Sequence, residues 1–230
     1  MEMQNSSGYL ERTERLLGRE SVALLGHKKI TIVGLGGVGG TCAEALARSG
    51  IGRLHLIDFD TVSPSNLNRQ LLATKETIGK KKTVAALARL QLVSDAELTA
   101  CDARITGENA DMLVPADTDL IVDAIDDIPA KLSLILLANR RGIPILSCLG
   151  AGNRLDAAAF FVTDIFKTEG DPLARRLRQL LRKAGISSLP VVCSRELPKK
   201  NGEPGPVGSF APVTGAAGLC AAAAAIKMLI

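Results

Sequence analysis

The 230-residue sequence has few aromatic residues, which make up only 3% of it, and it has no tryptophan. Its core must therefore be built from alanine, leucine, isoleucine and valine, a composition typical of parallel sheets covered by helices. Long apolar runs are also missing: the run 219–226 is shorter than the ~20 residues that cross a bilayer, and residues 1–9 contain no apolar signal core. We expect a soluble, cytoplasmic protein without a membrane span.

Paired cysteines are absent as well. The five cysteines are isolated and form no C-x-x-C motif, which excludes a structural zinc site with the usual spacing: Cys42, Cys101, Cys148, Cys193 and Cys220. An odd number of single thiols indicates a reducing compartment. Cys193 is the only thiol expected near a ligand crevice, and we interpret it as a packed strand residue.

Strand and helix patterns alternate along most of the chain, which indicates βαβ units. Strands are predicted at 29–33, 53–58, 97–101, 120–124, 145–149, 157–163 and 189–194. Helices are predicted at 11–17, 19–25, 37–48, 80–93, 108–113, 129–140, 172–184 and 214–230. The expected fold is α/β: a Rossmann-like, mostly parallel sheet with helices on both faces, extended by antiparallel strands in the C-terminal third.

A glycine-rich loop follows the first predicted strand and opens the next helix. Gly34, Gly36 and Gly39 fit the pattern G-x-G-x-x-G, with Gly37 inside it. Here the first glycine permits a tight turn, the second lets a phosphate approach the backbone, and the third lets helix and strand pack closely. Asp58 ends the next strand, 19 residues after Gly39 (58 − 39 = 19), where an acid can bind a ribose. The sequence therefore predicts a nucleotide site.

The glycine pattern alone would also fit a nicotinamide dehydrogenase. Hydride-transfer sites usually contain a histidine or a Tyr–Lys pair near the nicotinamide. The only tyrosine, Tyr9, lies upstream of the glycine loop, His27 precedes the first strand, and His55 lies inside the second. These positions make an oxidoreductase the less favoured interpretation. It stays open as an alternative.

Residues beyond the second strand favour a triphosphate instead. A triphosphate carries about four negative charges and needs cationic side chains together with a metal ion. Arg69 and Lys82 can supply the cations, and Asp126 follows a strand at the position where a carboxylate could hold Mg²⁺ over the same crevice. We therefore predict ATP and Mg²⁺ as the cofactors.

These motifs, taken in order, resemble the adenylating domain of ubiquitin-activating-like proteins, which include the molybdopterin- and thiamine-synthesis adenylyltransferases. The matching residues are Gly34–Gly39, Asp58-Phe59-Asp60, Asn66-x-x-Arg69-Gln70, Lys82 and Asp126. The resemblance implies that Asp58 holds the ribose, that Asn66, Arg69 and Lys82 contact phosphates, and that Asp126 serves the metal. Asp60 and Gln70 belong to the same nucleotide-binding set.

The resemblance also implies a homodimer with shared sites. An arginine of the N-terminal helix would reach the partner's triphosphate, and Arg15 matches that position better than Arg12. Adenine is expected near Ala103 and Arg104. The chain would then form one adenylating domain, with N-terminal helices at 11–28, a nucleotide-binding core at 29–152, and a substrate-binding portion at 153–230 that contains a mobile loop, 195–212.

The second half resembles the branch of this family that dehydrates threonylcarbamoyladenosine in tRNA. The resemblance lies in 163–168, 171–178 and 189–198 and in the Gly/Pro-rich loop beyond. It implies that the enzyme adenylates the threonyl carboxylate and that a nitrogen of the same modification then closes a ring as AMP leaves. An adenylyltransferase for a ubiquitin-like sulfur carrier and a regulatory module without turnover stay open, as does a sulfur-transfer or other accessory protein as a partner.

A basic helix follows Pro172. Its cations, joined by one residue upstream, are dense enough to follow an RNA backbone: Lys167, Arg175, Arg176, Arg178, Arg182 and Lys183. A solvated helix face is the alternative, and the family resemblance favours tRNA.

Overall fold

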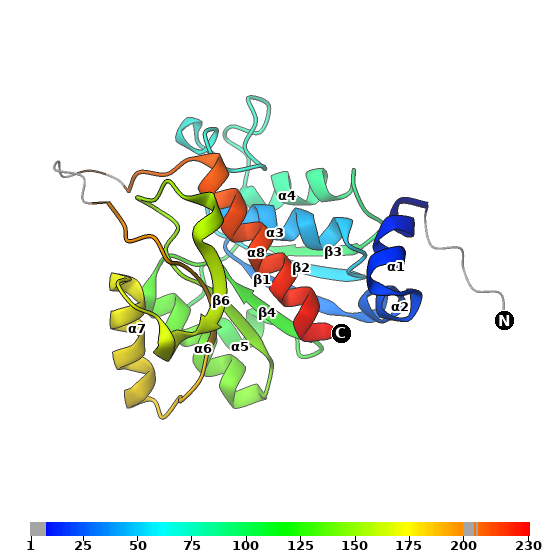
Figure 1. The fold of residues 1–230 in the computed structure, drawn as a ribbon. Coiled ribbons are helices and arrows are strands. Elements are labelled where there is room, and N and C mark those ends of the chain that lie inside the picture. Colours follow the sequence, from blue (N-terminus) through cyan, green and yellow to red (C-terminus); the bar gives the residue numbers. More distant parts are fainter. Residues whose placement is uncertain (1–7, 200–204, 206) are drawn as a thin grey trace.

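The computed structural model describes residues 8–199, 205 and 207–230. In these residues one seven-stranded sheet runs through the protein in the order β3-β2-β1-β4-β5-β7-β6 (Figure 1). All neighbouring strands are parallel except β6, which pairs antiparallel with β7. This confirms the predicted α/β fold and its antiparallel extension in the C-terminal third.

The strands are β1 (Lys29–Val33), β2 (Arg53–Ile57), β3 (Glu97–Cys101), β4 (Leu120–Asp123), β5 (Ile145–Cys148), β6 (Phe160–Asp164) and β7 (Pro190–Ser194). The α-helices are α1 (Glu11–Leu17), α2 (Arg19–His27), α3 (Gly37–Arg48), α4 (Lys82–Leu90), α5 (Ala110–Leu113), α6 (Ile128–Arg141), α7 (Pro172–Lys183) and α8 (Ala211–Leu229). Short 3₁₀ turns lie at Gly8–Leu10, Pro64–Asn66, Ala157–Ala159 and Ile165–Lys167.

Several predicted boundaries were wrong, three of them for clear local reasons. The strand expected from residue 157 begins at Phe160, because the Asp156 side chain accepts a hydrogen bond from Ala158 N (2.8 Å) and caps a 3₁₀ turn. The helix expected from residue 80 begins at Lys82, because Lys81 forms a β-bridge with Thr61. The last helix begins three residues early, at Ala211, since proline is tolerated in a first helical turn.

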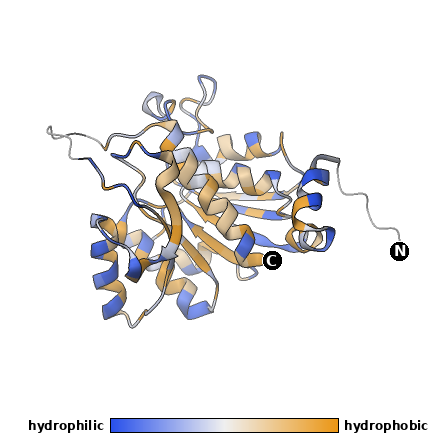
Figure 2. Ribbon diagram, in the orientation of Figure 1, coloured by the Kyte–Doolittle hydropathy of each residue, from blue (hydrophilic) through white to orange (hydrophobic). Residues whose placement is uncertain are grey.

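Helices cover both faces of the sheet, and the sheet separates two apolar clusters. On one face, Ile30, Ile32 and Val122 pack with residues of α3, α4 and α8. On the other, Val33, Ile121 and residues of β5 and β7 pack with α5, α6 and α7. This alternation along the strands is what a sheet buried on both faces requires. Figure 2 shows the strands and inner helix faces as hydrophobic and the outer helix faces as hydrophilic.

The strand order reverses between β1 and β4, since the chain winds outward from β1 through β2 to β3 and then crosses back to β4. Crevices outside the carboxyl ends of the strands at such a point are where open α/β sheets bind ligands. The loops after β1 and β4 meet there: a Cβ atom on Gly34 would lie 2.7 Å from the Ala124 carbonyl oxygen. The topology thus fixes the position of the site.

Helix α8 packs along α3 and against the sheet (Figure 1). Its 19 residues are long and apolar enough, by length and composition alone, to cross a membrane, in contrast to the eight-residue run singled out in the sequence. Alanines and Gly218 fill the buried side, where a Cβ on Gly218 would lie 2.5 Å from the Val38 carbonyl oxygen. This close helix–helix approach is the environment of a core helix.

Candidate functional site

A cleft of about 620 Å³ opens at the carboxyl ends of β1, β2 and β4. It is lined by the glycine loop, by residues after β2 and β4, by the first turn of α4, and by residues 150–152 on its far side. Thirteen of the predicted site residues lie at this one cleft or in the glycine loop behind it: Gly34, Gly36, Gly37, Gly39, Asp58, Asp60, Asn66, Arg69, Gln70, Lys82, Ala103, Arg104 and Asp126.

The glycine loop has the shape that a phosphate requires. Gly34 has φ +91°, a conformation that disfavours a side chain. A Cβ on Gly39 would lie 1.8 Å from the Gly34 carbonyl oxygen, whereas one on Gly36 would have no neighbour closer than 3.9 Å. Space is therefore open in front of Gly36, and no side chain caps the N-terminus of α3. The free N–H groups and the positive end of the helix dipole can bind an anion there.

Asp58 is fixed by backbone groups on both oxygens. Oδ2 accepts a hydrogen bond from Leu35 N (2.6 Å) and Oδ1 from Asp60 N (2.8 Å). The residue is 7% exposed. Because a carboxylate has about four acceptor positions, Asp58 can still receive ribose hydroxyls while it holds the glycine loop to the end of β2.

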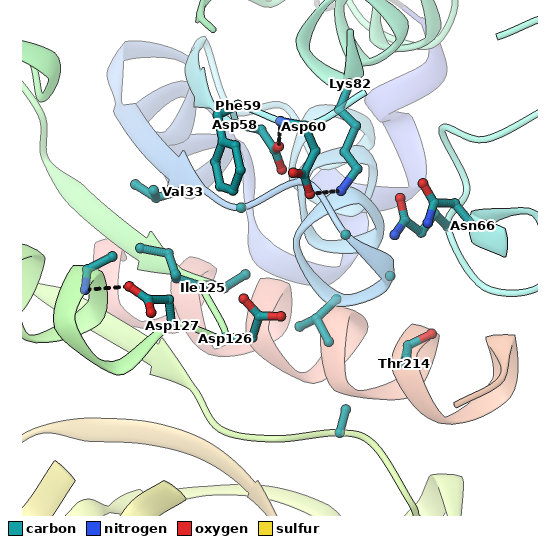
Figure 3. A pocket seen from close by; sticks show the side chains of 18 of the residues that line it. Val33, Asp58, Phe59, Asp60, Asn66, Lys82, Ile125, Asp126, Asp127 and Thr214 are labelled. Carbon is teal, nitrogen blue, oxygen red and sulfur yellow. Dashed lines mark hydrogen bonds and ion pairs between the residues drawn. The ribbon is translucent and has the colours of Figure 1, made fainter. Parts of the chain in front are cut away.

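Lys82 is a buried cation at the start of α4. Its ammonium lies 2.7 Å from Oδ2 of Asp60, and its side chain is only 7% exposed (Figure 3). Asp60 is 46% exposed and lines the same cleft. A phosphate entering the cleft would offer Lys82 a second anionic partner without moving it into solvent.

The segment 64–70 brings three more polar side chains to the cleft. Asn66 is held by its capping of the 3₁₀ turn, in which its Oδ1 accepts from Ser63 N (3.0 Å). Arg69 donates from Nη1 to Ser65 O and Asn68 Oδ1, both at 2.9 Å. Gln70 is 6% exposed, and its Oε1 has no hydrogen-bond partner among the described residues. A buried amide oxygen without a partner is costly unless a ligand or water satisfies it, so Gln70 fits a polar ligand.

Two adjacent aspartates after β4 have different surroundings. Asp127 caps α6 by accepting from Ala130 N (3.0 Å), whereas the Asp126 carboxylate accepts no hydrogen bond from the described residues and faces the cleft below the glycine loop (Figure 3). Among the described residues no three His, Cys, Asp or Glu side chains gather into a metal cage. One carboxylate beside a phosphate site is nevertheless a usual set of protein ligands for Mg²⁺, which takes its other ligands from phosphates and water.

Arg104 lies over the exposed ring of Phe59, with Cζ 5.1 Å from the ring centroid, and pairs with Asp127 at 3.6 Å. Ala103 and Arg104 line the cleft on the side of β3, and the adenine stays a prediction there. A flat, partly apolar wall of this kind suits a nucleobase.

A buried hydrogen-bond network around Lys131, below the loop that carries Asp126, was not predicted from the sequence. The Lys131 ammonium donates to Asp123 Oδ2 (2.7 Å), Ser147 Oγ (3.0 Å) and Cys148 O (2.9 Å), and both ionic side chains are fully buried. Asp123 Oδ1 also accepts from Ile125 N (3.1 Å) and so holds the loop that carries Asp126. The only signal in the sequence is a charged residue inside an apolar strand, opposite another on an apolar helix.

Arg15 is not part of the cleft. It lies on α1, which packs against α2 beyond the amino ends of the strands (Figure 1), where it is exposed and pairs with Glu11 at 2.6 Å. A role in catalysis would require it to reach a second subunit.

The basic helix divides into outward and inward cations. Arg175, Arg176 and Lys183 are exposed, as is Arg182, which lies over the Phe166 ring at 5.4 Å. Arg178, in contrast, is half-buried and donates from Nη1 to Thr168 O (2.8 Å) and to Thr168 Oγ1. Its guanidinium is bonded within the fold, so we remove Arg178 from the predicted RNA surface. Lys167 ends the 3₁₀ turn before α7.

Cys193 lies inside β7 and is 3% exposed. Burial raises its pKa to about 11, so the thiol is protonated at neutral pH. This agrees with a packed strand residue. All five cysteines are free.

Comparisons with known proteins agree with this geometry. A family model described as the ThiF family matches residues 10–230. The tRNA threonylcarbamoyladenosine dehydratase of Bacillus subtilis is 38% identical over 189 residues, which cover 81% of this chain and 74% of that protein. Its counterpart in Escherichia coli is 37% identical over 74% of this chain, and the matched region spans 64% of that relative's length. The E. coli molybdopterin-synthase adenylyltransferase is 30% identical over 89% of the chain and 74% of that protein.

Solved structures give the same result. The crystal structure of E. coli tRNA N6-threonylcarbamoyladenosine dehydratase in complex with ATP matches with a TM-score of 0.91 at 33% identity, covering 96% of this chain and 93% of that one. A structure of that protein in complex with AMP matches equally well.

Proposed function

The chain belongs to the ThiF family, and from that premise we propose that it is an ATP-dependent tRNA threonylcarbamoyladenosine dehydratase. The observation that carries the proposal is the cleft itself. The glycine loop, Asp58, the buried Lys82 and Asp126 line one cleft, in a fold that matches a dehydratase solved in complex with ATP. We assign nucleotide binding to residues 29–152 and tRNA binding to residues 153–230, on one adenylating domain in a reducing, cytoplasmic setting.

In the first step, a carboxylate oxygen of the threonyl group attacks the α-phosphorus of ATP. A new P–O bond forms, the bond to the β-phosphate oxygen breaks, and pyrophosphate leaves. Lys82 and Arg69 neutralise charge on the phosphates, and Asp58 fixes the ribose so that the α-phosphate faces the incoming carboxylate. Mg²⁺, held by Asp126, would supply further charge neutralisation as pyrophosphate departs.

In the second step, a nitrogen of the same modification attacks the acyl carbon. The C–N bond forms, the bond to the AMP oxygen breaks, and the nitrogen loses its proton. The ring closes with net loss of water, and no cysteine nucleophile is needed because the second nucleophile belongs to the substrate. This agrees with the protonated, buried state of Cys193.

We further propose that the active unit is a homodimer in which Arg15 of one subunit reaches the triphosphate of the other. The exposed position of Arg15 outside its own cleft supports this. The need for an accessory protein would be tested by reconstitution with purified components alone.

The deciding experiment is mass spectrometry of tRNA nucleosides after incubation of tRNA carrying threonylcarbamoyladenosine with enzyme, ATP and Mg²⁺. We expect a product lighter by one water, formed with stoichiometric AMP and pyrophosphate. Parallel reactions with NAD and with a small carrier protein ending in Gly-Gly serve as controls. Pyrophosphate release that depends on the carrier and not on tRNA would replace this proposal with the sulfur-carrier alternative.

A further inference from the structure

A buried arginine lies behind the far wall of the cleft, opposite the glycine loop. Arg154 is 3% exposed, and its guanidinium donates four hydrogen bonds to three separate segments. It donates to the carbonyl oxygens of Gly150 and Gly152 (the latter at 3.2 Å), to Glu196 O (2.9 Å), and to Asp171 Oδ2 (2.8 Å). Gly150 and Gly152 themselves line the cleft.

Asp171 connects the same group to α7. Its Oδ2 pairs with Arg154, while its Oδ1 accepts from Ala174 N (2.9 Å) and caps the helix. Leu173, in the first turn of α7, lines the cleft. One ion pair, whose side chains are 2% and 5% exposed, therefore connects the cleft wall directly to the start of the basic helix.

Stability alone is a weak explanation for such a pair. Buried ion pairs contribute little net stability compared with apolar residues of the same size, because desolvation offsets their attraction. A planar guanidinium with five donors does, however, fix the relative positions of several acceptors at once, which an apolar group cannot do. The pair is thus suited to maintaining a geometry.

We infer that Arg154 is a positioning residue for the tRNA half of the reaction. It fixes the position of the wall at 150–152 relative to the first turn of α7, so that an RNA bound to α7 presents its modified base to the nucleotide cleft. This inference rests on the proposed function. Its structural part is that Arg154 and Asp171 couple the motions of the wall and α7.

Arg154→Lys and Asp171→Asn test it. The first keeps a charge but loses the fork of donors; the second keeps an oxygen that can cap α7 but loses the negative charge. Arg141→Lys is the matched control, because Arg141 likewise bonds a carbonyl, Val114 O (2.8 Å), and an aspartate, Asp111 (2.8 Å), away from the cleft. Thermal denaturation of each variant reports whether it folds.

Amide hydrogen exchange measures the coupling between the cleft wall and α7, and it needs no substrate. We expect faster exchange in peptides covering 149–155 and 171–178 together in both variants, with the rest of the sheet unchanged. Faster exchange in only one of these peptides, or in neither, would overturn the inference. If Arg154→Lys does not fold, the exchange measurement on Asp171→Asn alone tests the coupling.

Steady-state kinetics then measure the consequence. A misplacement of about 1 Å far from the chemistry can lower a rate by 10²-fold, so we expect kcat/KM for tRNA to fall about 10- to 100-fold while the Kd for ATP stays within about twofold. An equal loss of ATP affinity would reduce Arg154 to a structural role. If the wild-type protein makes no cyclic product, the proposed function fails, and the exchange result still decides whether the coupling exists.

Discussion

The nucleotide side of the cleft and its proposed tRNA side are each held by a buried ion pair, but the two pairs connect different kinds of segment. Lys131 and Asp123 connect a helix to two central, adjacent strands. Arg154 and Asp171 connect a loop to the start of α7 and to the segment after β7. The nucleotide side is thus part of the sheet, whereas the tRNA side is attached to it by loops. A fold built in this way can keep one adenylation site while its substrate side varies.

The largest expected effect lies on the nucleotide side. Asp126→Asn removes the proposed metal carboxylate without a change of size, and we expect adenylation to fall by about 10³-fold, since a catalytic metal contributes several kcal/mol to the transition state. Asp127→Asn is the control, because asparagine can still cap α6. Assays of pyrophosphate release compare the two variants, and similar activities in both would contradict the assignment.

The second test measures how much the Lys131–Asp123 pair on the nucleotide side contributes to the stability of the fold. Lys131→Met leaves Asp123 buried and unpaired, which should lower the free energy of unfolding by about 3–5 kcal/mol. The double variant Lys131→Met, Asp123→Asn should recover part of this loss, because no charge is left without a partner. Urea denaturation measures both, and a single variant as stable as the wild type would mean that water or another group replaces the lysine.

The third test addresses the proposed sharing of the nucleotide side between subunits. Arg15→Ala and Arg69→Ala proteins should each be nearly inactive. On mixing, random exchange gives about half mixed dimers, each with one intact site, so about a quarter of wild-type activity should return. Mass spectrometry of the intact complexes verifies the exchange. Exchange without any return of activity would show that Arg15 does not act in trans.

The smallest effect is expected on the tRNA side. Changing Arg175, Arg176 and Lys183 together to alanine should reduce the salt dependence of tRNA binding by about one unit of slope for each lost phosphate contact. ATP affinity should not change. Arg140→Ala, which removes a 65% exposed cation on α6, is the control. Filter binding at several salt concentrations gives the slopes, and an unchanged slope in the triple variant would identify α7 as a solvated face.

These two sides also differ in how well the sequence predicts them. The glycine loop, Asp58, Lys82 and Asp126 were predictable because each directly follows a strand or opens a helix, and parallel strands bring their carboxyl ends together. The residues of the two buried pairs gave no comparable signal, since their partners come from different elements and only tertiary packing joins them. The inward turn of Arg178 depends on Thr168, which lies in a neighbouring turn, so helical periodicity could not reveal it.

The packing of α8 on α3 has a consequence for how the protein is made. Thr214, on α8, lines the nucleotide cleft beside Gly37, where a Cβ would lie 2.7 Å from its hydroxyl oxygen. The ribosome reaches Thr214 177 residues after Gly37 (214 − 37 = 177). At about 5–20 residues per second, translation leaves the phosphate loop without this neighbour for about 9 to 35 seconds. A nascent chain therefore carries every residue of the nucleotide fingerprint well before Thr214 is available to line the cleft.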